Sequence, residues 1–372
     1  MIAPESLAPA DAVSVMPRAH AGARDPEALA KLARDLGPGP FAAVILFVSP
    51  EADRGALEAG LPVAFPGVTV IGCTTAGEIS PEGYSEGEIV AVALPWSTFA
   101  VDCLGIDLAA LDGQELIGRL IRARAGLARL HPGWEDELAV VLVDGLSLRE
   151  DELPAALGPG LGPVPLFGGS AGDGTRFEET SVLQDGQFRP GWAVLMLVRT
   201  ACKVKVFSLN HLTPTNRRMV VTGADPARRV VHQINAEPAA QEYARLLGKD
   251  PGQLTTFTFA AHPVVVRIGG SHHVRAIQQM APNGDLVFFS AIDEGLVLTL
   301  AEPQDMAVHL DKALSDLSEG GRPAAILACD CILRRIEAME NQRFGAVSAL
   351  LKQHGVVGFS TYGEQLNSMH VN

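Results

Sequence analysis

The chain is short of positive charge and of long apolar runs, and both shortages exclude classes of partner. It has 29 Lys and Arg residues against 43 Asp and Glu, which gives a formal net charge of −14 at pH 7. Nucleic acids and anionic membranes are bound through clustered basic residues, so no nucleic-acid partner and no membrane partner is expected. No apolar run reaches the roughly 20 residues that a membrane-spanning helix needs.

Cysteine is also scarce, and no export signal is visible. The five cysteines are an odd number. Residues 1–24 form an Ala- and Pro-rich lead-in that lacks the basic head and apolar core of a signal peptide. Reduced thiols and a cytoplasmic location are therefore expected. Hydrophobic residues make up 47% of the chain and charged residues 19%, a balance typical of a globular protein whose length favours two or three domains.

The sequence does contain a nine-residue pattern that occurs twice, with a looser third copy. Residues 70–78 read VIGCTTAGE, residues 356–364 read VVGFSTYGE, and residues 165–173 read PLFGGSAGD. Each copy is a short apolar run followed by glycine, hydroxyl groups and a carboxylate, which indicates a strand that runs into a polar loop. Three such loops predict a ligand cleft built from repeated units that converge; the alternative is that they are tight turns between core strands.

An apolar strand candidate begins about 30 residues before each copy, which is the size of a strand–helix–strand unit. These strands cover residues 43–48, 138–143 and 325–329. Strand pairs are predicted beyond the first two copies, residues 89–94 with 99–104 and residues 192–197 with 204–207. The third copy has no such pair before Asn372, so the C-terminal part is expected to end differently or to lack a terminal strand. The predicted fold is α/β, with mixed sheets built from repeated strand–helix–strand units, two related halves and helices outside.

The three loops resemble those of FIST proteins, which are bacterial sensory proteins with an N-terminal and a C-terminal FIST domain. The resemblance is carried by residues 72–78, 167–173 and 358–365. It implies an N-terminal domain over residues 25–209, a crossover over residues 210–236 and a C-terminal domain over residues 237–372. No kinase, cyclase or helix-turn-helix motif is visible, so the implied output partner is a separate protein, a histidine kinase or a cyclic-di-GMP enzyme.

Further stretches resemble the branch of this family described as haem-binding and nitric-oxide-sensing. They are Asn210-His211, residues 220–225 and residues 329–335. This resemblance implies a haem cofactor, which would be held without covalent bonds because no Cys-x-x-Cys-His motif is present. His211 is the first candidate for the haem iron, since it follows a predicted strand beside the expected interdomain pocket. His262, which has aromatic neighbours, and His370 are further candidates; the alternative for each is an ordinary structural histidine.

The alternative function is a sensory module without haem that binds an amino-acid-like metabolite through the three loops. The predicted ligand-binding residues come from all three loops: Cys73, Thr74, Thr75, Gly77, Glu78, Gly168, Gly169, Ser170, Asp173, Ser360, Thr361, Gly363 and Glu364. The acids among them suit an amine or a cation, although acids at such positions also cap turns. Cys73 is expected to be either the most accessible thiol or a small filler.

A hydrolase is a minor alternative. Residues 168–172 superficially suggest the Gly-x-Ser-x-Gly turn of serine hydrolases, and Asp293 with His309 or His354 nominally completes a triad. The sister loops carry Thr74 and Ser360 in a longer loop instead, which favours binding over catalysis. Residues 329 and 331 are cysteines that face one side of a strand, but no second cysteine pair completes a zinc site, so buried thiols are the simpler interpretation.

Overall fold

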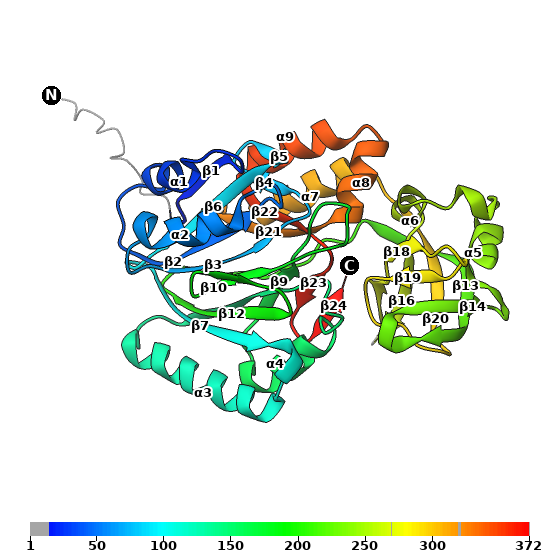
Figure 1. The fold of residues 1–372 in the computed structure, drawn as a ribbon, viewed down its shortest axis with the longest axis horizontal. Coiled ribbons are helices and arrows are strands. Elements are labelled where there is room, and N and C mark those ends of the chain that lie inside the picture. The colour runs from blue at the N-terminus through cyan, green and yellow to red at the C-terminus, as the bar shows by residue number, and fades with distance from the viewer. Residues whose placement is uncertain (1–14, 269, 319–320, 372) are drawn as a thin grey trace, which may run out of the picture.

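The computed structural model describes residues 15–268, 270–318 and 321–371. It has a main body in which three sheets meet, and a separate sheet inserted into the chain, which lies to the right of the body in Figure 1. The predicted α/β class with mixed sheets is confirmed. No helix of the described part of the chain is both long and apolar enough to cross a membrane.

The body is built from three related units. The first unit comprises β1 (Arg18–Gly22), α1 (Ala28–Leu36), β2 (Phe41–Val48), α2 (Arg54–Ala64), β3 (Thr69–Thr74), β4 (Glu78–Ser80), β5 (Gly83–Ser85) and β6 (Glu88–Pro95). The second comprises β7 (Phe99–Asp107), α3 (Gly113–Leu130), β8 (Asp136–Val143), α4 (Glu152–Leu161), β9 (Leu166–Ser170), β10 (Val182–Gln184), β11 (Gln187–Arg189) and β12 (Trp192–Thr200). The third comprises α7 (Met306–Ser318), β21 (Ile326–Cys331), α8 (Ile332–Glu340), α9 (Phe344–His354), β22 (Val356–Thr361), β23 (Glu364–Leu366) and β24 (Met369–Val371).

The inserted sheet comes between the second and third units. Its strands are β13 (Leu212–Asp225), β14 (Val230–Ile234), β15 (Glu237–Pro238), β16 (Val264–Ile268), β17 (Ser271–Val274), β18 (Ile277–Met280), β19 (Leu286–Phe288) and β20 (Val297–Pro303). Two helices accompany it, α5 (Ala239–Leu247) and α6 (Thr256–Ala261). Residues 210–236, predicted to be a crossover, thus form strands β13 and β14 of this sheet.

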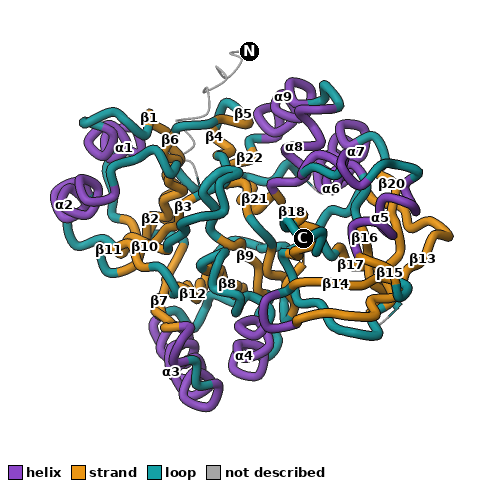
Figure 2. The backbone as a smooth tube through the Cα atoms, turned by 45° about the vertical axis from the view of Figure 1, so that its right-hand side comes forward, coloured by secondary structure: helices purple, strands orange, loops and turns teal. Residues whose placement is uncertain are grey.

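Each unit contributes a hairpin to the sheet of another unit. The parallel pairs β2–β3, β8–β9 and β21–β22 are the units' own strands. The hairpin β4–β5 pairs with β22, β10–β11 pairs with β3, and β23–β24 pairs with β9. β4 accordingly lies beside β22, and β10 beside β3, in Figure 2. This cyclic exchange relates the three units by a pseudo-threefold arrangement and explains why the sequence pattern occurs three times.

The apolar runs of the first strands are buried on both faces because layers cover both faces. In β2, Val44 and Leu46 pack with Leu32 of α1 and Leu57 of α2. The alternate residues of β2 pack against β8, β12 and β22 in a central core: Ala43, Ile45 and Phe47. Helices α3 and α4 cover the second sheet, and α7 and α9 cover the third, in the same way. Helices therefore lie outside and one shared core lies where the three sheets meet.

Two predicted strand pairs are wrong. β6 and β7 lie in different sheets. β6 pairs with β2 within the first unit, and β7 pairs with β12 within the second unit. Residues 204–207 form no strand in the described structure, because residues 203–211 cross from the second sheet toward the third unit. The N–H of Val204 accordingly donates to the Asp136 carboxylate, at 3.4 Å, rather than to a neighbouring strand.

Candidate functional site at the junction of the body and the inserted sheet

The loops after β3, β9 and β22 meet at the centre of the body and hydrogen-bond to one another in a ring. The N–H of Ala76 donates to the carbonyl of Ser360 at 2.9 Å, that of Tyr362 to Ser170 at 3.3 Å, and that of Gly172 to Thr74 at 3.0 Å. The donors occupy equivalent positions in the three copies of the sequence pattern, and so do the acceptors. The three loops therefore converge at the centre of the pseudo-threefold arrangement, as predicted, and the ligand cleft predicted between them stays a prediction, since neither described cavity is lined by these loops.

The first glycine of each copy is required by close packing of parallel strands. A Cβ atom on Gly72 would lie 2.2 Å from the carbonyl oxygen of Leu46. The equivalent distances are 1.8 Å from Gly168 to the oxygen of Val141 and 1.9 Å from Gly358 to the oxygen of Ala328. All three contacts are far below any allowed separation, so these glycines serve the strand pairing rather than a ligand.

In the first and third loops the predicted ligand-binding threonine bonds to the acid of its own loop, and these side chains are buried or partly buried. The Thr75 hydroxyl donates to Glu78, and the Thr361 hydroxyl donates to Glu364. Burial raises the pKa of Glu78 to about 7 and that of Glu364 to about 8, while the threonine hydrogen bonds oppose the rise. Thr75 and Thr361 are 0% exposed. In this conformation the ring is a polar core in which the threonines satisfy the acids, while the buried Ser360 hydroxyl has no hydrogen-bond partner among the described residues.

The acid of the second loop stabilises a turn. Asp173 accepts the N–H groups of Phe177, Glu178 and Glu179 at 2.8–3.0 Å, and also the Tyr362 hydroxyl. Burial opposes its ionisation, but these hydrogen bonds outweigh burial and place the pKa of Asp173 below its usual value. Asp173 thus caps a turn.

Cys73 is a filler and not an accessible thiol. It is 0% exposed, and burial raises its pKa well above the usual thiol value. It lies beside Phe47 of β2, whose ring stacks on Phe359 with centroids 4.6 Å apart. Cys329 faces Phe359 in the third unit, so the first and third units both combine a large with a small side chain at this level. No cluster of metal-ligating residues occurs within the described ranges.

His211 is buried among charged groups, with both ring nitrogens engaged. Its Nδ1 is 2.9 Å from a guanidinium nitrogen of Arg334, and its Nε2 is 3.0 Å from a carboxylate oxygen of Glu337. The side chain is 3% exposed. A bond from this ring to a haem iron would require breaking one of these two contacts.

A haem does not fit His211 or His370 as they stand. His211 has no free ring nitrogen, and His370 lies close to charged groups. His262 is half-buried at the C-terminal end of α6, where burial lowers its pKa, and its carbonyl accepts the hydroxyl of Tyr243 at 2.6 Å. A porphyrin needs an apolar slot beside a free ring nitrogen, and the charged surroundings of His211 and His370 do not provide that combination.

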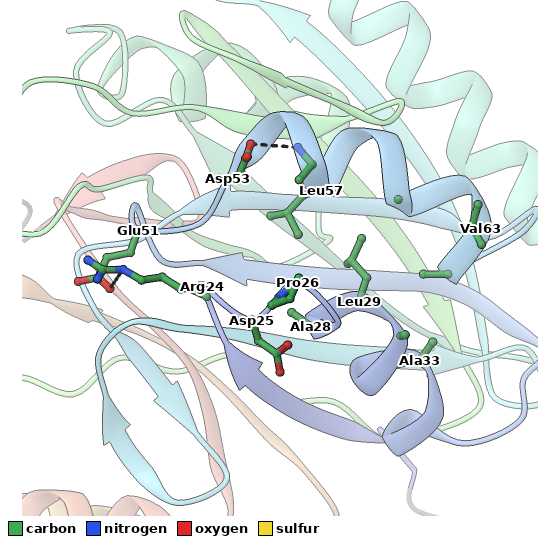
Figure 3. Close-up of a pocket in the computed structure, with 15 residues that line it drawn as sticks. Arg24, Asp25, Pro26, Ala28, Leu29, Ala33, Glu51, Asp53, Leu57 and Val63 are labelled. Carbon is green, nitrogen blue, oxygen red and sulfur yellow. Dashed lines mark hydrogen bonds and ion pairs between the residues drawn. The ribbon is translucent and has the colours of Figure 1, made fainter.

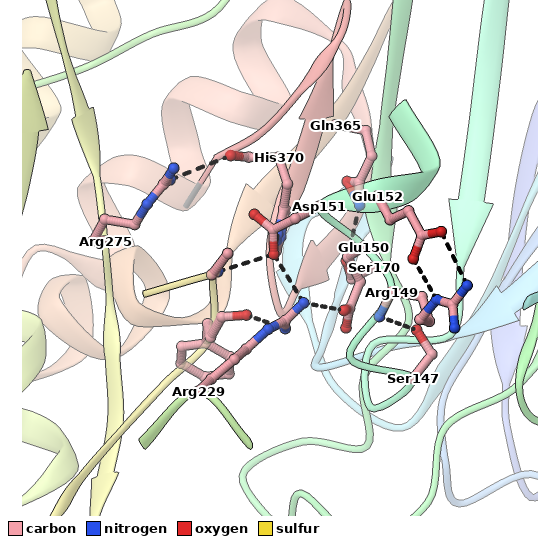
Figure 4. Close-up of polar contacts among 12 residues, drawn as sticks. Ser147, Arg149, Glu150, Asp151, Glu152, Ser170, Arg229, Arg275, Gln365 and His370 are labelled. Atoms are coloured by element: carbon pink, nitrogen blue, oxygen red, sulfur yellow. Dashed lines mark hydrogen bonds and ion pairs between the residues drawn. The ribbon is translucent and has the colours of Figure 1, made fainter. Parts of the chain in front are cut away.

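A buried ion pair joins the inserted sheet to the body. Arg229 lies at the turn between β13 and β14 in a left-handed conformation, with φ of 55°. Its guanidinium donates to Glu150 at 2.6 Å and to Asp151 at 2.9 Å, both in the loop between β8 and α4 (Figure 4). The N–H of Ala291 in the inserted part also donates to Asp151, at 2.9 Å. Burial raises the pKa of Glu150, although Arg229 opposes the rise.

A row of polar side chains runs from the ring of loops to this junction (Figure 4). The amide of Gln365 donates to the Ser170 hydroxyl at 3.3 Å, and Gln365 pairs across the hairpin β23–β24 with His370. The Nδ1 of His370 is 3.4 Å from a carboxylate oxygen of Asp151, which is ion-pair distance without hydrogen-bond geometry. The row thus links Ser170, a predicted site residue, to the contact between body and insert.

The arrangement around Ser170 differs from a hydrolase site. Ser170 is 1% exposed, and the partner of its hydroxyl is the Gln365 amide rather than a histidine. A nucleophilic serine needs a base within hydrogen-bond reach of its oxygen. The nominated His309 and His354 lie in α7 and α9 of the third unit.

Two cavities are lined by other residues than the predicted site residues, although the second reaches Glu337, the partner of His211. A groove of about 780 Å³ between α1 and α2 is lined largely by small apolar side chains, with Arg24, Glu51 and Asp53 toward one end (Figure 3). Arg24 pairs with Glu51, and Asp53 caps α2. A second cavity of about 290 Å³ lies beside Glu337 and Arg343. The polar groups named in the groove have structural partners, so the groove is not the candidate site.

The protein thus consists of a body of three α/β units that exchange hairpins and of an inserted sheet. Buried polar groups gather where the body and the inserted sheet meet. The chain belongs to the FIST family: the FIST N domain matches residues 42–237 and the FIST C domain matches residues 239–367. FIST domains are sensory, ligand-binding domains of signal transduction and not a known catalytic family. No curated protein matches the chain.

The residues of the junction escaped the sequence analysis. Arg229, Glu150, Asp151 and Arg275 belong to no repeated pattern, and the Arg228-Arg229 pair carries no signal of its own. Gln365 directly follows the third loop, so its position beside the predicted site could be recognised from the sequence. Its importance follows only from its pairing with His370, which requires knowledge of the hairpin register.

Proposed function

We propose that this protein is a cytoplasmic sensor that binds a small metabolite at the junction between the body and the inserted sheet. Binding changes how the inserted sheet sits on the body, and a separate signalling enzyme, a histidine kinase or a cyclic-di-GMP enzyme, reads that change. The observation that carries the proposal is the buried pairing of Arg229 with Glu150 and Asp151 across the junction.

A buried ion pair suits a contact that has two positions. Desolvating both charges cancels much of their attraction, so such a pair adds little net stability compared with apolar packing. It nevertheless selects one geometry, because an unpaired buried charge is costly. The side chains of Arg229 and Glu150 are 5% and 2% exposed. A ligand that alters this pairing therefore shifts the equilibrium between two positions of the inserted sheet on the body, at a small cost in free energy.

A metabolite is favoured over a haem with nitric oxide as the signal. The ionic contacts of His211 and the polar surroundings of His370 suit a small polar ligand and offer no apolar slot. We therefore expect the purified protein, mixed with haemin, to show only the spectrum of unspecific haem. A stoichiometric Soret band that is lost in His211→Ala or His370→Ala, with His272→Ala as the control, would reverse this choice.

The signalling part of the proposal is tested by the distance between the two parts. One spin label on α3 and one on the exposed turn at Asn283, between β18 and β19, report the placement of the insert on the body. Adding a mixture of small metabolites should shift the distance distribution. A variant with Arg229→Met should show the shifted distribution without ligand. A distribution that no ligand and no junction variant alters would show that the two parts do not move.

A further inference from the structure

The pseudo-threefold arrangement provides an internal comparison for the hairpin β23–β24. In the hairpin β10–β11, Leu183 pairs with Phe188, and in β4–β5, Ile79 pairs with Tyr84. Gln365 and His370 occupy the same two positions in the third hairpin. In every case the first residue of the pair faces the first glycine of a loop strand, Gly72, Gly358 or Gly168. Two copies thus carry an aliphatic–aromatic pair where the third carries two polar side chains.

These two polar side chains are buried without full partners. Gln365 is 1% exposed and His370 is 4% exposed. Among the residues that the structure describes, Oε1 of Gln365 and both ring nitrogens of His370 lack a hydrogen-bond partner. A buried polar group without a partner is destabilising, so polar residues at positions that the sister hairpins fill with apolar ones require a reason. A bound ligand is such a reason.

Arg275 adds a cation that is attracted by the nearby charge of Asp151 but makes no direct ion pair with a described carboxylate. It follows β17 in the inserted sheet, and its guanidinium donates at 3.3 Å to the carbonyl of Val274 and at 3.4 Å to that of His370. Its Nε is buried without a partner, and it forms no ion pair with any described carboxylate. Burial lowers its pKa. Asp151, the nearest acid in the row, is held by Arg229 and by the N–H of Ala291.

We infer that Gln365, His370 and Arg275 bind a small carboxylate that carries a hydroxyl or ammonium group on the adjoining carbon. The carboxylate accepts hydrogen bonds from Nε of Arg275 and from Nε2 of His370, which have no hydrogen-bond partner among the described residues. The hydroxyl or ammonium group donates to Oε1 of Gln365. Gln365 and His370 come from the body and Arg275 from the insert, so the ligand bridges the junction. This inference rests on the proposed function and names the ligand class for it.

The test uses glycolate, glycine, acetate and methylammonium as probes and thermal stabilisation as the readout, since a ligand of the folded state raises the melting temperature. Glycolate or glycine should stabilise the protein most. Acetate, which lacks the donor, should require at least about tenfold higher concentration, the loss of roughly one hydrogen bond to a buried group. Methylammonium should have no effect. Stabilisation by inorganic phosphate alone, or by none of the carboxylates, overturns the inference.

The matched variant copies the sister hairpin. Gln365→Leu combined with His370→Phe reproduces the pair Leu183 and Phe188, so the hairpin should fold with an unchanged or higher melting temperature. The response to glycolate and glycine should disappear in this variant. If the variant fails to fold, Arg275→Met, whose described side-chain contacts are backbone carbonyls, should weaken the response at least about tenfold. His272→Phe on the exposed part of β17 is the control that should respond as the unaltered protein does.

The outcomes separate the site from the signalling function. A response that survives in the Leu–Phe variant shows that the ligand binds elsewhere, which overturns the inference but leaves the sensor proposal standing. A response that is lost in the variant, with no change in the label distance between body and insert, supports the site and contradicts the proposed signalling.

Discussion

At the level of single residues, the most unusual feature is a pair of carboxylic acids in the ring of loops, of which Glu78 is buried and Glu364 partly buried. Glu78 and Glu364 occupy equivalent positions, and each accepts a hydrogen bond from a threonine three residues earlier. Burial raises the pKa of Glu364 from its ordinary 4.5 to about 8. At neutral pH this acid therefore holds a proton in the folded chain that it loses in the unfolded chain.

This difference predicts a pH-dependent loss of stability. The contribution of Glu364 is fully present below pH 4.5 and is lost as the pH rises to about 8, because only the unfolded chain releases the proton in that range. The substitution Glu364→Gln keeps an acceptor for Thr361 and removes the titration. The difference in the free energy of unfolding, variant minus unaltered protein, should therefore increase by about 1.4 kcal/mol for each pH unit in this range.

Urea denaturation at pH 5, 7 and 9 measures this difference. Glu340→Gln, an exposed position at the end of α8, is the control and should give curves parallel to those of the unaltered protein. If Glu364→Gln also gives parallel curves, the carboxyl is ionised in the folded chain and the ring is more open to water than the structure indicates.

At the scale of elements, the strands of each unit depend on the glycine that begins the loop motif. Gly168 in β9 faces the carbonyl of Val141 so closely that even a methyl group must displace the strand. Gly168→Ala should therefore destabilise the protein by about 3 kcal/mol or more, as overpacking of a core does. Measurement of the denaturation midpoint tests this expectation.

Gly126 supplies the matched control, because it lies inside α3 with nothing within 4 Å of its Cβ position. Gly126→Ala should stabilise the protein by about 0.5–1 kcal/mol, since alanine loses less backbone freedom in a helix. Equal effects of the two substitutions would show that close strand packing does not explain the loop glycines.

At the scale of the whole molecule, the junction ion pair predicts the effect of removing one charge. Arg229→Met leaves Glu150 buried without its partner, which should cost about 3–5 kcal/mol of the free energy of unfolding at pH 8. The cost should be smaller at pH 5, because burial raises the pKa of Glu150 and a protonated carboxyl is no longer a buried charge.

The double variant Arg229→Met with Glu150→Leu removes both charges and should recover much of the loss, since apolar replacements of buried ion pairs are often neutral. A double-mutant cycle in urea measures the coupling. If the two single substitutions simply add, the two side chains are not coupled across the junction.

Local sequence patterns were sufficient to predict the main strands and the family. The apolar runs at residues 43–48 and 138–143 indicated strands, and the structure has β2 and β8 there. The glycine patterns marked the ends of β3, β9 and β22. These signals are local, because burial on both faces requires a continuous apolar run and close strand packing requires glycine.

Which strands pair and which side chains meet could not be predicted from local patterns, because both depend on the arrangement of the whole fold. The exchange of hairpins between units joins residues hundreds of positions apart, such as Glu364 with Gly169 or Ile79 with Gly358. The residues of a strand indicate which of its faces are buried but not which strand it pairs with. For this reason β6 and β7, which are neighbours in the sequence, were predicted to pair. For the same reason His211 looked free at a strand end, and it lies bonded to Glu337 and Arg334 instead. Polar groups from separate elements gather at the junction because the fold places them there, and no local pattern records that placement.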